Sequence, residues 1–192
     1  MAFAIVGTAQ TGSPAVIPSH PLYAAKIAGE TAVESMAPND TARIRAKLRH
    51  AGNRANESLV LANKNMTELA NETAEDYAQK MQEVNDLGQN ISDLAQSGNI
   101  SQVIARATQH HAKVLSTVYE RVPEQAKAAI GRALNRSVKG HDMAVQAMRN
   151  HGMDTSKFNI TSRIPSDVRG RVGIPASPGA AAGRTAPRGS GG

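Results

Sequence analysis

Residues 99–148 of the 192-residue chain read NISQVIARATQHHAKVLSTVYERVPEQAKAAIGRALNRSVKGHDMAVQAM, and this stretch decides the fold. Apolar or small residues recur there at steps of three and four, a spacing typical of helices that bury one side. The repeating positions are Ile100, Ile104, Ala107, His111, Val114 and Val118, then Ala126, Ile130, Leu134, Val138, His141, Val145 and Met148. The stretch therefore predicts two long amphipathic helices.

The junction between these helices is Val122-Pro123-Glu124. Proline has no N–H and a fixed φ, so it suits the first turn of a helix and disfavours helix in the residue before it. Glu124 then places an anion in the first turn, where the helix dipole favours it. The junction predicts a sharp turn or a kink, and facing apolar stripes favour a hairpin.

Three further helices are predicted upstream, over about 21–37, 41–63 and 67–96. The first carries a narrow apolar stripe, formed by Leu22, Ala25, Ala28, Ala32 and Met36. Short connections favour antiparallel neighbours, so we expect an all-α bundle of about five helices over residues 20–150. An N-terminal arm and linker would occupy 1–19. Residues 151–192, which are rich in glycine, proline and arginine, are interpreted as a disordered tail.

The charge of +6 is unevenly distributed, because residues 151–192 alone carry a net +4. The predicted bundle is therefore near neutral, and a basic tail without aromatic residues among its arginines gives little support for nucleic-acid binding. Cysteine is absent, which excludes disulfides, thiolate metal sites and cysteine nucleophiles.

The chain begins MAFAIVGTAQ, an apolar run too short to span a bilayer. It is similar to the last part of a signal peptide, with Thr8 and Ala9 near a possible cleavage site, but it lacks a basic start. Two interpretations stay open: the true start lies upstream, or the run is an apolar arm.

The triplet Asn-X-Ser/Thr occurs eight times, at Asn39, Asn56, Asn65, Asn71, Asn90, Asn99, Asn135 and Asn159. Random placement of the same residues would give about 1.6. The triplet is the acceptor of N-glycans outside the cytoplasm, and it needs an exposed amide. Asn39, Asn65, Asn99 and Asn159 fall at predicted connections, so these are the best glycosylation candidates. Helix capping would also account for the first three, but not for the asparagines within helices.

Two segments carry a family resemblance. HPLYAAKIAGE, with the arginine-rich helix after it, resembles a P-L-Y-x-x-K-x-x-x-E pattern, and VYERVPEQAKAAIGRALNRSVKG resembles V-x-E-x-V-P-E-x-A-x-x-A-I-x-x-A-L-x-x-S-x-x-G. Both are similar to the domain-of-unknown-function family 5667, an archaeal and bacterial family of exported helical domains. The resemblance covers about 21–148. It implies an all-helical fold outside the cytoplasm and no catalytic residues, and it says nothing about His141, where family members carry arginine.

Candidate site chemistry is sparse. His111 and His141 would lie roughly 9 Å apart along the helix axes, so we interpret them as partly buried packing residues. His141, Met148 and His151 are the weak candidates for a copper or zinc site, since thioether and imidazole ligands suit copper. The carboxylates are interpreted as a solvated face, and they lie at Glu72, Glu75, Asp76, Glu83 and Asp86. No HExxH, phosphate loop or nucleophile elbow occurs, so we expect no enzyme and no cofactor.

The sequence thus favours a non-enzymatic helical module, exported or on the cell surface and N-glycosylated, that contacts a protein partner or itself through helical seams. Association with the cell envelope is compatible with it, and no transmembrane span is expected. Two alternatives are an extracytoplasmic metal-binding or stress-sensing protein, and a nucleic-acid binder that uses the tail.

Overall fold

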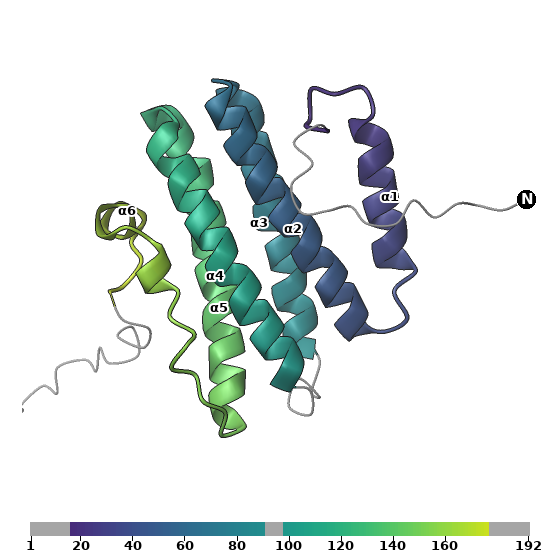
Figure 1. Cartoon of the computed structure of the whole chain (residues 1–192), viewed down its shortest axis with the longest axis vertical. Helices are drawn as coiled ribbons and strands as arrows, with labels where there is room; N and C mark the ends of the chain where they lie inside the picture. The colour runs from purple at the N-terminus through teal and green to yellow at the C-terminus, as the bar shows by residue number, and fades with distance from the viewer. Residues whose placement is uncertain (1–15, 91–97, 177–192) are drawn as a thin grey trace, which may run out of the picture.

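The computed structural model describes residues 16–90 and 98–176, and every regular element in these ranges is helical (Figure 1). The elements are α1 (Tyr23–Ser35), α2 (Asp40–Asn63), α3 (Thr67–Asn90), α4 (Gly98–Arg121), η2 (Glu124–Ala126), α5 (Lys127–Asn150), η3 (Thr161–Arg163) and α6 (Ser166–Val172). The predicted all-α fold is confirmed. The end predicted for the third helix, 91–96, lies outside the described residues.

Four long helices form the body of the molecule. α2 packs on α3 and α4 packs on α5, and further contacts join α3 to α5 and α2 to α4. α1 lies at one side of this bundle, against α2, whereas η3 and α6 lie at the other side, against α4 and α5 (Figure 1).

The helix ends follow from local chemistry. Asn39 caps α2, because its Oδ1 accepts a hydrogen bond from the Ala42 backbone N–H at 2.8 Å. Between α2 and α3, Asn65 has a φ of 59°, a left-handed conformation that asparagine tolerates better than most residues. Pro123 is extended and starts the short helix η2, so the predicted sharp turn separates α4 from α5.

Small residues let the four helices approach closely. Ala51, Ala70, Ala105 and Ala133 are fully buried between larger apolar side chains. The largest of these buried side chains are Ile44, Leu61, Tyr77, Met81, Ile100, Leu115, Ile130, Leu134 and Met148. The result is a slender bundle with a continuous core along its length.

The interpretation of residues 151–192 as a disordered tail is wrong for 151–176. Ile160, Ile164, Val168 and Ile174 are buried and belong to the same core cluster as the bundle. Ile160 precedes η3, Ile164 follows it, Val168 lies within α6 and Ile174 follows α6, and both short helices contact α4 or α5. The folded domain therefore extends to at least residue 176.

None of the helices within 16–90 and 98–176 is both long and apolar enough to cross a membrane. The longest helices carry charged residues along their exposed sides, as expected for helices that contact water.

Candidate functional site

Helix α1 packs on the bundle with its charged side. Tyr23, Lys26, Glu30 and Glu34, spaced three or four residues apart, are half-buried or buried. The apolar stripe that the sequence marked lies on the opposite side of the helix and is exposed. A stripe of this kind ordinarily faces the core, so α1 is the reverse of a usual amphipathic helix.

The charged side of α1 meets charged residues of α2 and α3. We call this set the charged cluster: Tyr23, Lys26, Glu30 and Glu34 of α1, Lys47, His50, Arg54 and Glu57 of α2, and Lys80 and Glu83 of α3. Four cations face four carboxylates in it. This balance matters because a buried charge without a partner is strongly destabilising.

Arg54 is the centre of one half of the charged cluster, and only 3% of this residue is exposed. Its Nη1 donates to both Glu57 oxygens, at 3.1 and 3.0 Å, and its Nη2 pairs with Glu30 of α1. The Tyr23 hydroxyl donates to Glu57 Oε2 at 3.1 Å, and Lys26 pairs with the same carboxylate. Burial, followed by the negative charge of Glu57, raises the pKa of Tyr23, so its hydroxyl remains a donor.

Glu34 is the centre of the other half. One of its oxygens accepts from His50 Nδ1 at 2.6 Å, and the other pairs with Lys47 at 2.8 Å and Lys80 at 2.9 Å. Burial acts to raise the pKa of Glu34, but these three donors outweigh it and lower the pKa to about 2. Glu34 therefore stays ionised at neutral pH. Glu83 completes this half by pairing with Lys47 and Lys80.

The charged cluster serves to hold α1 against α2 and α3. Each of its four carboxylates already has one or more cationic partners, and the pKa of Glu34 is far below that of a general acid or base at neutral pH. The arrangement fixes α1 in register on α2 and α3 and turns the apolar side of α1 outward.

The structure does not place His141, Met148 and His151 on a common surface. His141 and Met148 are buried, whereas His151 is exposed at the end of α5. His141 Nδ1 lies 3.2 Å from both Ala105 O and Thr108 Oγ1, and Nε2 lies 3.3 Å from Phe158 O. Burial lowers the pKa of His141 although the contacts with the Phe158 and Ala105 carbonyl oxygens act to raise it, so the ring is neutral at neutral pH and occupies a packing position.

His111 is a second buried histidine. The Tyr77 hydroxyl lies 3.4 Å from its Nδ1, and the two rings meet edge to face with centroids 5.5 Å apart. Burial, with a smaller effect of His110, lowers the pKa of His111 to about 3. His111 therefore also acts as a neutral core residue.

All four preferred glycosylation candidates have exposed asparagine side chains: Asn39, Asn65, Asn99 and Asn159. Two of them already make local hydrogen bonds through Oδ1, because Asn39 caps α2 and Asn159 accepts from Thr161 Oγ1 at 2.7 Å. Asn56 and Asn135 are exposed as well, Asn71 is half-buried, and the side chain of Asn90 is outside the description. Exposure at these sites is the geometric condition for modification, and occupancy stays a prediction.

The charged cluster was missed by sequence reasoning, although its signal is present. The segment that matches P-L-Y-x-x-K-x-x-x-E supplies Tyr23, Lys26 and Glu30, and all three contact Arg54 or Glu57. The pattern therefore has a structural explanation, since its polar residues join α1 to α2. The interpretation of Glu83 as fully solvated is also wrong, because this half-buried residue belongs to the cluster.

Comparison with known proteins gives one family match. The family described as "Domain of unknown function (DUF5667)" matches residues 15–125, a range that includes the whole charged cluster and ends before α5. No curated protein and no solved structure matches the chain.

Proposed function

Because the chain belongs to the DUF5667 family, whose description assigns no activity, we propose a function from its geometry. The protein is a non-enzymatic, exported helical module that binds a partner helix through the outward side of α1. The observation that carries this proposal is the reversed orientation of α1. We call its exposed side the outer face, formed by Leu22, Ala25, Ala28, Gly29, Ala32, Val33 and Met36.

The outer face exposes large apolar side chains that a monomer would be expected to cover. Leu22 is 61% exposed, Val33 47% and Met36 82%. They gather at one helix, and exposed apolar residues that gather in this way mark interaction sites. Burying Leu22 and Met36 against a partner would recover the hydrophobic free energy that the isolated chain leaves unused.

The spacing of the outer face fits a helix as the partner. Leu22, Ala25, Gly29, Ala32 and Met36 follow steps of three and four, the seam of a coiled coil. Alanine and glycine at the centre permit a close approach, and the face carries no charge because the charges of α1 lie in the charged cluster. This chemistry favours a partner helix whose contacting side is also uncharged.

Export is supported by the eight Asn-X-Ser/Thr triplets, of which six have exposed asparagine side chains. Of the six exposed acceptors, one lies on each of α2, α4 and α5, two lie in the connections before and after α2, and one lies in the C-terminal segment; none lies on the outer face of α1. Glycans at these positions leave the outer face open to a partner, in agreement with a role at the cell surface.

A photo-crosslinking amino acid at Ala28, used in the native host, tests the binding role. We expect a single defined adduct from Ala28, and its loss when Ala32→Asp adds a charge to the outer face. The same crosslinker at Gln146, an exposed position on α5, is the matched control. Equal crosslinking at both positions, or an adduct that survives Ala32→Asp, contradicts the proposal.

Mass spectrometry of the protein from its native host tests export separately. We expect N-glycans on the exposed triplets or processing of the N-terminus. Cytosolic protein with an intact Met1 and unmodified asparagines would contradict export without affecting the binding role of α1.

A further inference from the structure

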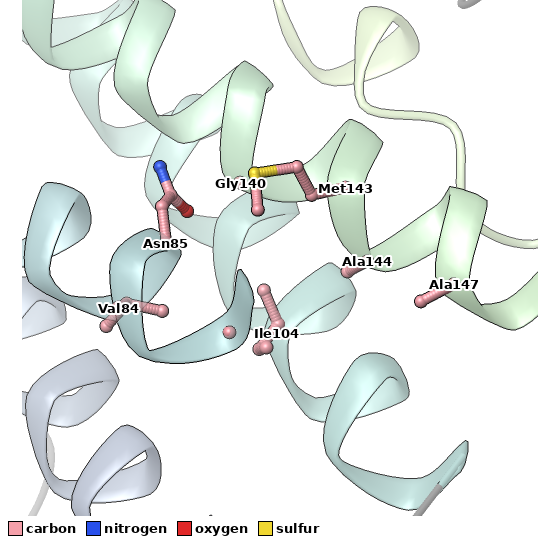
Figure 2. Close-up of a pocket in the computed structure, with 8 residues that line it drawn as sticks. Val84, Asn85, Ile104, Gly140, Met143, Ala144 and Ala147 are labelled. Carbon is pink, nitrogen blue, oxygen red and sulfur yellow. The ribbon is translucent and has the colours of Figure 1, made fainter. Parts of the chain in front are cut away.

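The exposed large apolar side chains within residues 16–90 and 98–176 all lie on the outer face of α1: Leu22, Val33 and Met36. α1 stands at the side of the bundle, so its outer face points away from α2 (Figure 1). Another apolar space, a cavity of about 160 Å³ among α3, α4 and α5, is lined in part by Val84 and Ile104 (Figure 2). That cavity is too small for a helix, which is about 10 Å wide. The outer face is therefore the apolar surface that a helix can cover.

The outer face has nearly the same order of side chains when it is read from either end of α1. Gly29 is its centre. Leu22 and Met36, the N-cap and C-cap residues of α1, each lie seven residues from Gly29, and Ala25 and Val33 each lie four residues from it. The longest side chains are thus at the two ends of the face, and glycine is in the middle.

A second copy of α1, turned end for end, matches this order. In an antiparallel pair centred on Gly29, Leu22 of each copy lies beside Met36 of the other, and the two glycines meet at the axis. Such a two-fold contact is self-complementary, because every pair of residues occurs twice. Nothing lies within 4 Å of a Cβ atom built on Gly29, so the middle of the face leaves room for the second backbone to approach closely.

The charges of the chain do not oppose this contact. Lys26, Glu30 and Glu34 are the charged residues of α1, and each is paired with residues of α2 or α3 in the charged cluster. Two copies of a chain with a net charge of +6 can therefore meet through a face that carries no charge. In an antiparallel pair the N-terminus of each helix also lies beside the C-terminus of the other, an arrangement that the helix dipoles favour.

We propose that the partner helix of the outer face is α1 of a second copy of this chain, packed antiparallel across a two-fold axis at Gly29. This inference rests on the proposed function, because it names the helix that the outer face binds. α1 has 13 residues, a length of about 20 Å. A single pair of such helices falls at the small end of specific interfaces, below about 1,200 Å². The dimer is therefore reversible and depends on protein concentration.

Single cysteines test the geometry, since the chain has none of its own. Gly29→Cys places a thiol at the proposed axis, so mild oxidation of the full chain should give a disulfide-linked dimer. Thr31→Cys is the matched control: this residue is exposed but lies on another side of the same helix, and it should stay unlinked. Equal linking of the two variants would overturn the proposal.

The direction of the pair has its own test. Chains with Leu22→Cys mixed with chains that carry Met36→Cys should link to each other, whereas neither variant alone should link to itself. Efficient linking of Leu22→Cys to itself would indicate parallel helices and would overturn the antiparallel pair.

Sedimentation velocity measures the dimer without a crosslink. The sedimentation coefficient of the unmodified chain should rise with protein concentration, and Ala32→Asp should abolish this rise because it puts two charges into the contact. Circular dichroism confirms that each variant is folded. A sedimentation coefficient independent of concentration, together with no linked dimer from Gly29→Cys, overturns the second copy as the partner.

The photo-crosslinker at Ala28 separates this inference from the proposed function. An adduct with the mass of two chains supports both. An adduct with a different protein keeps the binding role of the outer face and overturns the second copy as its partner.

Discussion

Arg54 and Glu57 stand one helical turn apart on α2 and are joined by two hydrogen bonds of 3.1 and 3.0 Å from the same guanidinium nitrogen. Both residues are buried, and Arg54 also pairs with Glu30 of α1. The guanidinium thus links a carboxylate of its own helix to one of α1. Since α1 makes few other contacts with the bundle, its position depends on this arrangement more than on apolar packing.

Replacing Arg54 by methionine should destabilise the protein by about 3–5 kcal/mol, because Glu30 would lose its cation and Glu57 one of two. Urea unfolding followed by circular dichroism measures the change. Arg132→Met is the control, since Arg132 pairs with Glu75 at an exposed site and should cost less than about 1 kcal/mol. Similar small losses in both variants would show that the charged cluster does not hold α1.

Acid should loosen α1 at a defined pH. The folded-state pKa of Glu34, about 2, lies below its ordinary value of 4.5. Its contribution to stability is therefore complete above about pH 4.5 and is lost as the pH falls toward 2. Hydrogen exchange measures this through the protection factor, the intrinsic exchange rate at each pH divided by the observed rate. Between pH 5 and pH 3 the protection factors of the α1 amides should fall more than those of the α4 amides. Glu34→Gln should show fast α1 exchange already at pH 5, and an unchanged pH profile in that variant would refute the assignment.

Most of the architecture could be predicted from the sequence because apolar periodicity determines which helices form. Four of the five predicted helices begin and end within a few residues of α1, α2, α4 and α5, and caps such as Asn39 explain the agreement. Periodicity also placed His111 and His141 at packing positions, and both are buried.

The orientation of α1 could not be predicted from the same rule. An apolar stripe predicts which side of a helix is buried only when the polar side of that helix has no oppositely charged residues to pair with on a neighbouring helix. Here Lys26, Glu30 and Glu34 find partners on α2 that are spaced three or four residues apart: Lys47, His50, Arg54 and Glu57. The charged residues of α1 and those of α2 recur with the same period, which is a signal that sequence reasoning could have used. Which residue of α1 pairs with which residue of α2 is set by tertiary contacts.

Gly52 should be intolerant of alanine although it lies within a helix. A Cβ at position 52 would lie 2.8 Å from His111 Nε2, and the His111 ring is fixed by Tyr77. The clash should cost about 1–3 kcal/mol, partly offset by the higher helix propensity of alanine. Gly29→Ala is the matched control: nothing lies within 4 Å of its Cβ, so it should stabilise by about 0.5–1 kcal/mol. Thermal or urea unfolding that ranks the two variants in the opposite order contradicts this packing.

Stability should also fall in mild acid through the buried histidines. The folded-state pKa of His111, about 3, lies below its ordinary value of 6.5, so the unfolded chain binds more protons between these limits. Each such histidine lowers stability by up to about 1.4 kcal/mol per pH unit in this window, and His141 acts in the same direction. Urea unfolding at pH 7 and pH 5 measures the slope. His111→Leu should reduce the slope, whereas Tyr77→Phe should retain it. An equal slope in both variants would rule out His111 as the source.

The segment after α5 should contribute to stability as a core element does. Ile164 is buried in the main core cluster. The end of α6, later in the same segment, is hydrogen-bonded to α5, because Asn135 Nδ2 donates to Val172 O at 3.3 Å. Ile164→Ala should cost about 2–4 kcal/mol and Ile164→Val about 0.5–1.5 kcal/mol, in proportion to the methyl groups removed. Val33→Ala, at an exposed site of α1, should change the free energy of unfolding by less than about 0.5 kcal/mol. A disordered segment would give no such gradation, because removing methyl groups that contact only water leaves the free energy of unfolding unchanged. Graded losses at Ile164 would show that the apolar residues following α5 complete the core of the bundle.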